Sequence, residues 1–112
     1  MEVSFEQIDS FLVIAVTGRL DTVTAPQFDE KLPPVLAQPH PHILLDMSHV
    51  SYISSAGLRS ILQLVKHAEE NGARIGLFSV QAQIMDVLEI SDFPSRLDIY
   101  PDRPSALAGK AS

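Results

Sequence analysis

The residues best suited to chemistry gather in the middle of the chain, where Ser54 and Ser55 stand side by side. A serine hydroxyl can act as a nucleophile beside a general base, or it can cap the start of a helix. A Ser-His-Asp set can be drawn from Ser54, His49 and Asp46, but no G-x-S-x-G turn accompanies it. We therefore expect no catalytic triad and no other catalytic residue.

Metal and cofactor chemistry also lack their usual residues. His40 and His42 flank Pro41, but no third His or Cys lies near them and the chain has no cysteine, so we expect no metal site. Neither G-x-G-x-x-G nor G-x-x-x-x-G-K-[ST] occurs, which leaves the familiar phosphate-binding loops without a sequence signature. We expect no cofactor.

The composition is that of one small acidic domain. The 112 residues are 46% hydrophobic, and Asp and Glu outnumber Lys and Arg by 14 to 8, which gives a formal net charge of −6. This charge repels phosphate backbones, so nucleic acid is not an expected partner. The absence of cysteine, of a basic and apolar leader, and of any apolar run near the roughly 20 residues of a membrane span favours a cytoplasmic protein with no membrane insertion.

Apolar patterns on both sides of the serines predict strands. Residues 3–8 alternate and residues 11–16 are continuously apolar, so the turn-prone Asp9-Ser10 between them predicts a β-hairpin. Residues 42–47 are apolar enough for a central strand that is buried on both faces, followed by a connection over residues 48–54. Two further strands are expected, at 74–80 and around 97–100.

Helices are predicted between these strands. Thr24 is a candidate N-cap for the first helix, with Pro26 tolerated in its first turn, whereas Pro33-Pro34 should kink or shorten it. The clearest helix follows the serines and ends at Gly72. Its expected apolar face consists of Leu58, Ile61, Leu62, Val65 and Ala68. Shorter helices are expected at 81–89 and near 104–107, while Met47, Phe78, Met85 and Phe93 are expected to be packing residues.

The alternation of strands and helices predicts an α/β domain. We expect a mainly parallel, mixed sheet of four to five strands packed with about four helices, because parallel strands need helical crossovers. Within this plan Gly57 is unusual, since glycine in a helical turn costs about 1 kcal/mol relative to alanine. Either another surface approaches this turn closely, or Gly57 accommodates packing and one serine is only an N-cap.

Two motifs in the expected order resemble the STAS family, named for sulfate transporters and anti-sigma factor antagonists. The runs D-M-S at 46–48 and S-S-A-G-L at 54–58 are similar to the family's D-L-S, a spacer of similar length, and D-S-S-G-L or S-S-A-G-L. The run G-R-L-D-T-V-T-A at 18–25 looks like its G-x-L-D-x-x-T-A. The resemblance covers residues 3–108 of a single domain taken as 1–112, and it is closest to the stand-alone bacterial antagonists.

This resemblance implies a phosphorylation switch. In the family, the serine before the small-Gly-Leu turn is phosphorylated by a partner that is both anti-sigma factor and serine kinase, and a metal-dependent serine/threonine phosphatase reverses the reaction. The acceptor falls on Ser55, and Ser54, where the family often has Asp, is left open as a further acceptor. The unphosphorylated protein would bind the kinase, and the phosphorylated protein would release it.

The resemblance also implies a partner-binding surface. Asp21 matches an aspartate near the switch, Asp46 matches the acidic end of the central strand, and Arg59 beside the switch turn either contacts the partner or is merely solvated. The expected partner-binding residues are Asp21, Thr22, Asp46, Ser54, Ala56, Gly57, Leu58 and Arg59. The helix at 81–89 and the run 91–93 are candidates to extend this surface.

Two rival functions stay open at this point. STAS domains also serve as subunits of lipid-transport ABC complexes and of stress-signalling assemblies, and a fold does not fix a function. Some relatives bind or slowly hydrolyse nucleotides, and Asp21, Asp46 and Ser55 could line such a site, although the missing phosphate loop and the negative net charge disfavour it. The sequence does not determine the oligomeric state.

Overall fold

The fold is an α/β arrangement built on one mixed sheet. The computed structural model describes residues 1–90 and 97–109. Its elements are β1 (Glu2–Ile8), β2 (Phe11–Leu20), α1 (Ala25–Leu36), β3 (His42–Ile53), α2 (Ser55–Glu70), β4 (Arg74–Phe78), α3 (Ala82–Ile90), β5 (Leu97–Tyr100) and α4 (Arg103–Leu107). The five strands lie in the order β1-β2-β3-β4-β5, with β1 antiparallel to β2 and every other pair parallel. The predicted class, the hairpin and the central place of β3 are confirmed.

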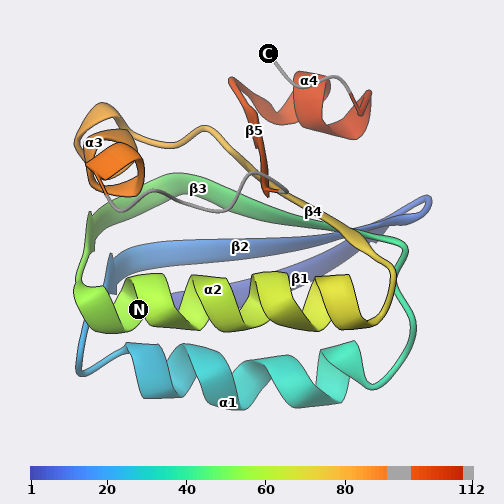
Figure 1. Ribbon diagram of the computed structural model, residues 1–112, viewed down its shortest axis with the longest axis horizontal. Helices are drawn as coiled ribbons and strands as arrows, with labels where there is room; N and C mark the ends of the chain where they lie inside the picture. Colours follow the sequence, from blue (N-terminus) through green and yellow to red (C-terminus); the bar gives the residue numbers. More distant parts are fainter. Residues whose placement is uncertain (91–96, 110–112) are drawn as a thin grey trace.

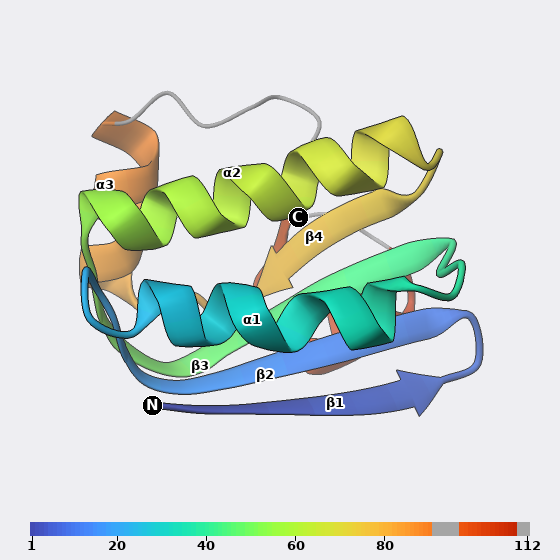
Figure 2. The ribbon, with the colours of Figure 1, turned by 90° about the horizontal axis from the view of Figure 1, so that it is seen from below.

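Helices cover both faces of this sheet. α1 and α2 run side by side along one face, and the short α4 lies on the other (Figures 1 and 2). The main core lies under α1 and α2 and includes Phe28, Ile61 and Leu64 packed on the strands. A smaller core of Val13, Leu44, Phe78, Tyr100 and Ala106 lies under α4. No helix within residues 1–90 and 97–109 is long and apolar enough to cross a membrane.

β3 is twice as long as the apolar run that predicts it. The chain stays extended from His42 to Ile53, so the expectation of a connection over residues 48–54 is wrong. The second half of β3 pairs with the end of β2 after two register shifts, near Ala15/Thr17 and Gly18/Arg19. Only Val50 and Ile53 are buried in this half, and the polar residues between them conceal the strand pattern. The extension carries the chain directly to Ser54.

α1 is one helix of 12 residues that passes through Pro33 and Pro34, so the expectation of a shortened helix is wrong. Both prolines are exposed, whereas Phe28 and Leu32 are buried against the core. Packing on the buried side therefore outweighs the loss of two amide donors. The helix carbonyls that lack these donors are on the exposed side, where water can bind them.

α2 begins and ends where the sequence indicates, but its buried face is rotated. The helix ends at Glu70, and Gly72 follows in a left-handed conformation with φ +67°, which confirms it as the stop signal. Leu64 is buried and Leu62 is 41% exposed, so the assignment of Leu62 to the core is wrong. Both positions satisfy helical spacing around Ile61 and Val65, and contact with α1 as well as the sheet selects Leu64.

The remaining elements agree with the sequence except at one strand end. β4 ends at Phe78 because Ser79 turns the chain with φ 55°, two residues before the predicted end at Val80. α3, β5 and α4 lie where they are expected. Met47 and Phe78 are buried and Met85 packs against the core. The predictions for Phe93 and for the run 91–93 lie outside the described residues.

Candidate functional site

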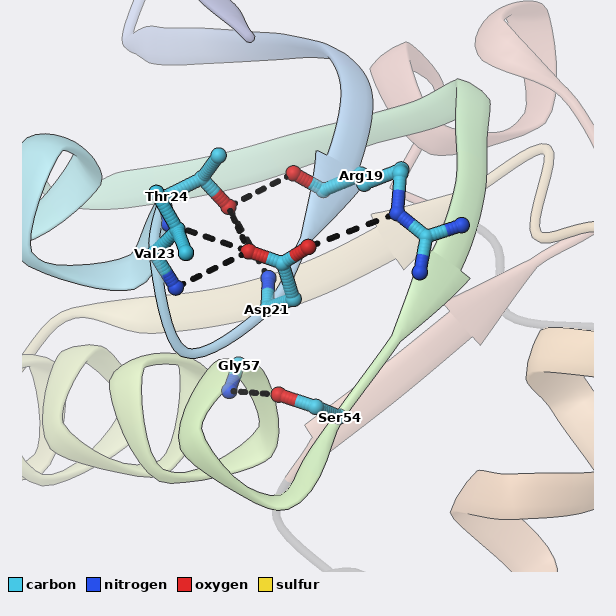
Figure 3. A network of polar contacts seen from close by, with 6 residues as sticks. All are labelled: Arg19, Asp21, Val23, Thr24, Ser54 and Gly57. Atoms are coloured by element: carbon cyan, nitrogen blue, oxygen red, sulfur yellow. Dashed lines mark hydrogen bonds and ion pairs between the residues drawn. The ribbon is translucent and has the colours of Figure 1, made fainter.

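Ser54 is the N-cap of α2. Its backbone is extended (φ −103°, ψ 178°), and its Oγ accepts a hydrogen bond from the Gly57 amide at 3.4 Å (Figure 3). Its carbonyl accepts from the Leu58 amide at 2.9 Å. The bond to Ser54 Oγ satisfies an amide that a helix start would otherwise leave without a partner, and the bond to the carbonyl is the first regular bond of the helix. The Ser54 hydroxyl therefore has a structural task.

Ser55 is the first residue of α2, and its side chain is exposed. Within the described part of the chain, no hydrogen bond engages its hydroxyl. The two serines thus differ although they are neighbours of the same type, because one hydroxyl faces the helix amides and the other faces solvent. Of the two, Ser55 is the one that a second protein can reach.

Gly57 is buried against the end of β2. A Cβ atom at this position would lie 2.4 Å from the Leu20 carbonyl oxygen and 2.9 Å from Ile53 Cγ1. The same carbonyl accepts a hydrogen bond from the Ser54 amide at 3.0 Å. The surface that approaches Gly57 so closely is therefore the chain's own backbone, and the interpretation of this glycine as room for a visiting partner is corrected to internal packing.

The turn between β2 and α1 is held by Asp21. Its Oδ1 accepts hydrogen bonds from the amides of Val23 at 3.0 Å and Thr24 at 3.1 Å, while the Asp21 carbonyl accepts from the Ala25 amide at 2.8 Å. These bonds, the Thr24 amide first, hold the pKa of the Asp21 carboxyl below its usual value. Asp21 holds this turn, and Thr24 is the N-cap residue of α1 as predicted, although its side chain makes no capping hydrogen bond.

Arg19 ties this turn to the end of β3. Its Nε lies 3.3 Å from Asp21 Oδ2, and its guanidinium carbon lies 4.2 Å from the centre of the Tyr52 ring (Figure 3 shows the ion pair). Arg19 and Tyr52 are also register partners across β2 and β3. The positive charge of Arg19 is therefore already committed inside the molecule.

Asp46 lies apart from this cluster. Its Oδ1 accepts hydrogen bonds from the Ser48 amide at 3.0 Å and the Ser48 hydroxyl at 2.6 Å, and that hydroxyl is 3.1 Å from His49 Nδ1. Seven further strand residues, 47–53, separate Asp46 from Ser54. Asp46 is thus in the middle of β3 and not at its end. The serine that contacts Asp46 and His49 is Ser48, and not Ser54 as a Ser54-His49-Asp46 triad would require.

The histidines flanking Pro41 have separate surroundings. His40 Nε2 is 2.8 Å from the Val35 carbonyl, and the His42 ring stacks on Phe11 with ring centres 4.8 Å apart. Across the described residues, no group of three or more His, Asp or Glu side chains could hold a metal ion. Two cavities of about 350 and 360 Å³ lie along α1 and α2, and neither is lined by Asp21, Ser54 or Ser55.

Ser55 instead belongs to an open, partly apolar surface. We define the switch surface as the exposed and half-buried residues of the first two turns of α2 and of the adjoining β2–α1 turn. These residues are Asp21, Thr22, Val23, Thr24, Ser55, Ala56, Leu58, Arg59 and Leu62. Val23 is 74% and Leu62 41% exposed, so this surface presents two large apolar side chains to solvent. Sequence reasoning missed both, because nothing in the local pattern distinguishes them from core residues.

The chain is similar to known proteins in sequence and in fold. The model of the STAS domain family matches residues 2–106 of the chain. A candidate anti-sigma factor antagonist of Bordetella bronchiseptica, BtrV, is 28% identical over 108 residues, which cover 96% of this chain and 93% of that protein. The structure of a candidate anti-sigma factor antagonist of Thermotoga maritima has a TM-score of 0.89 at 20% identity, covering 96% of this chain and 92% of that one. The anti-sigma factor antagonist SpoIIAA in its unphosphorylated form gives 0.71 at 16% identity, over 96% of both chains.

Proposed function

This chain belongs to the STAS domain family, because the family model spans nearly all of it, and on that premise we propose that it is an anti-sigma factor antagonist switched by phosphorylation of Ser55. With a free hydroxyl at Ser55, the switch surface binds an anti-sigma factor that is also a serine kinase. Phosphorylation ends this binding, and a serine/threonine phosphatase restores it. The proposal places the protein in the cytoplasm and assigns it no catalysis of its own.

The observation that carries the proposal is the contrast between the two serines. Ser55 is exposed and its hydroxyl has no partner among the described residues, whereas the Ser54 hydroxyl accepts from the Gly57 amide. A kinase needs a hydroxyl that can reach the γ-phosphorus of bound ATP, so that the new P–O bond forms, ADP leaves and the serine proton passes to a base of the kinase. Ser55 meets this need without any change in the fold.

The effect of phosphorylation follows from charge and burial. A phosphoryl group adds about −1.5 to −2 charges at pH 7. Leu58 is half-buried and Leu62 exposed beside Ser55, so a partner that covers them would have to bury the dianion as well. Burying a group of this charge is costly even beside an arginine, and the complex should therefore dissociate. The switch surface itself is tied down by Leu20 and Arg19 and need not change shape.

The proposal is tested by binding measurements with three proteins: the wild type, Ser55→Ala and Ser55→Asp. The partner is first identified by capture from the native cell, and a serine kinase supports the proposal, whereas transporter components would overturn it. Wild type and Ser55→Ala should bind the kinase alike, and Ser55→Asp should bind at least about tenfold more weakly. Ser54→Ala is the matched control and should remain a substrate. Equal affinity of all three proteins would contradict the proposal.

A further inference from the structure

The two arginines around Ser55 are in different situations. Arg19 is held in an ion pair with Asp21 and stacks on Tyr52. Arg59 is exposed, and within residues 1–90 and 97–109 it makes no ion pair or hydrogen bond. Arg59 is therefore the cation near Ser55 that is available to a new anion.

The positions of Ser55 and Arg59 on α2 bring their side chains together. Both lie in the regular part of one helix, four residues apart, so their Cβ atoms are roughly 6 Å from each other on the same face. An arginine side chain spans this distance easily, and its planar guanidinium donates paired hydrogen bonds to phosphate oxygens. If Arg19 were to bind the phosphoryl group instead, it would have to break its contacts to Asp21 and Tyr52.

We propose that Arg59 binds the phosphoryl group on Ser55 within the same helix, so that its guanidinium is no longer free to contact a partner when the protein is phosphorylated. This inference rests on the proposed function, since it needs Ser55 as the acceptor. Phosphorylation then changes the switch surface twice, because it adds a dianion and also removes the free cation that a partner can contact. Arg59 acts as a positioning residue for the phosphoryl group.

The consequence for the partner is a sharper contrast between the two states. In the unphosphorylated protein Arg59 is free to pair with an acidic side chain of the partner. In the phosphorylated protein that acidic side chain would face an arginine already paired with the phosphoryl group, and a second negative charge beside it. A partner with an acidic patch facing the start of α2 is therefore the kind that this switch discriminates best.

The test uses the full chain with phosphoserine installed at position 55 during translation, so that no kinase is needed. A phosphorus NMR titration gives the second pKa of the phosphoryl group. Arg59 favours the dianion, so Arg59→Ala should raise this pKa by about 0.4 unit relative to the parent phosphoprotein. Arg59→Lys should restore part of the difference. The control Lys66→Ala, on an exposed site later in α2, should leave the pKa unchanged.

A second signal comes from the arginine itself. On phosphorylation the Nε–H resonance of Arg59 should shift and that of Arg19 should not. Identical phosphate pKa values in the parent and in Arg59→Ala would overturn the inference. The phosphate titration contains no partner protein, so its failure would not contradict the proposed function. Equal partner binding by the Ser55 variants would contradict the proposed function but would not change the measured phosphate pKa.

Discussion

The carbonyl oxygen of Leu20 is so close to the α-carbon of Gly57 that a methyl group there would lie 2.4 Å from it. The same oxygen accepts the amide proton of Ser54. Two segments that are more than thirty residues apart, the end of β2 and the start of α2, are thus joined at a single backbone group. The switch surface is assembled from the two segments on either side of this contact.

The first prediction concerns that contact. Gly57→Ala should lower the free energy of unfolding by about 1 to 3 kcal/mol, because backbone at the end of β2 has no room to yield. Helix propensity alone predicts the opposite sign, a gain of about 1 kcal/mol. Urea denaturation monitored by circular dichroism decides between them, with Ser55→Ala as the exposed control in the same turn. Unchanged or increased stability of Gly57→Ala would refute the close approach.

The second prediction concerns acid. The pKa of Asp21 is lowered in the folded protein, mainly by its hydrogen bond from the Thr24 amide, so the carboxylate stabilises the fold above the unfolded-state pKa of 3.8. This stability is lost as the pH falls through the lower, folded-state pKa. Asp21→Asn should therefore destabilise the protein at pH 7 and reduce its loss of stability between pH 4 and about pH 2. Urea denaturation of the wild type and of Asp21→Asn at several pH values in this range measures the effect. An equal fall of the urea midpoint in the two proteins would contradict the assignment.

The third prediction concerns His42. Its ring stacks on Phe11, and its Nδ1 is buried with no hydrogen-bond partner among the residues that the structure describes. Burial, followed by the charge of Arg74, lowers its pKa, while Asp98 acts in the opposite direction. A lowered histidine pKa stabilises the fold above pH 6.5, and this contribution disappears as the pH falls through the folded-state value. His42→Phe keeps the stacking and removes the titration. Its thermal midpoint should therefore fall less than that of the wild type between pH 7 and pH 5.

The fourth prediction concerns the apolar part of the switch surface. Leu62→Ala and Val23→Ala should each weaken binding of the anti-sigma factor by about tenfold, since exposed apolar anchors contribute most when a partner desolvates them. Stability should change by less than about 0.5 kcal/mol because both side chains are exposed in the free protein. Titration calorimetry with the purified partner measures the affinity. Ile90→Ala on α3, which removes a side chain that is 85% exposed, should leave it unchanged.

The fold could be predicted for elements whose residue pattern reflects contact with a single neighbouring element. β1 and β2 form a hairpin because their alternating and apolar runs flank Asp9-Ser10, where Asp9 takes a φ of 51°. The pattern fails where two neighbours compete for one element. α2 packs on both the sheet and α1, so spacing alone could not distinguish Leu62 from Leu64. β3 continues to Ile53 because β2 supplies a pairing partner that the local sequence does not contain.

The candidate site could be predicted by residue type but not by role. Either Ser54 or Ser55 could cap a helix, and only the position of the Gly57 amide assigns the cap to Ser54. Thr24 is the N-cap of α1 by position, but its hydroxyl donates to the Arg19 carbonyl and accepts from the Asp21 amide, so it does not cap the helix amides. The motif of Asp46 precedes the serines closely in sequence and predicts a place beside them, but seven further residues of an extended strand separate Asp46 from Ser54.

The engaged hydroxyl of Ser54 has a consequence for fidelity. An enzyme that encounters two identical side chains in succession ordinarily needs its own means to choose between them. Here the two hydroxyls differ before any kinase arrives, because the Ser54 oxygen accepts a hydrogen bond from the Gly57 amide and the Ser55 side chain is exposed. For the proposed phosphorylation of Ser55, the local geometry of the target thus contributes to the choice between the two serines.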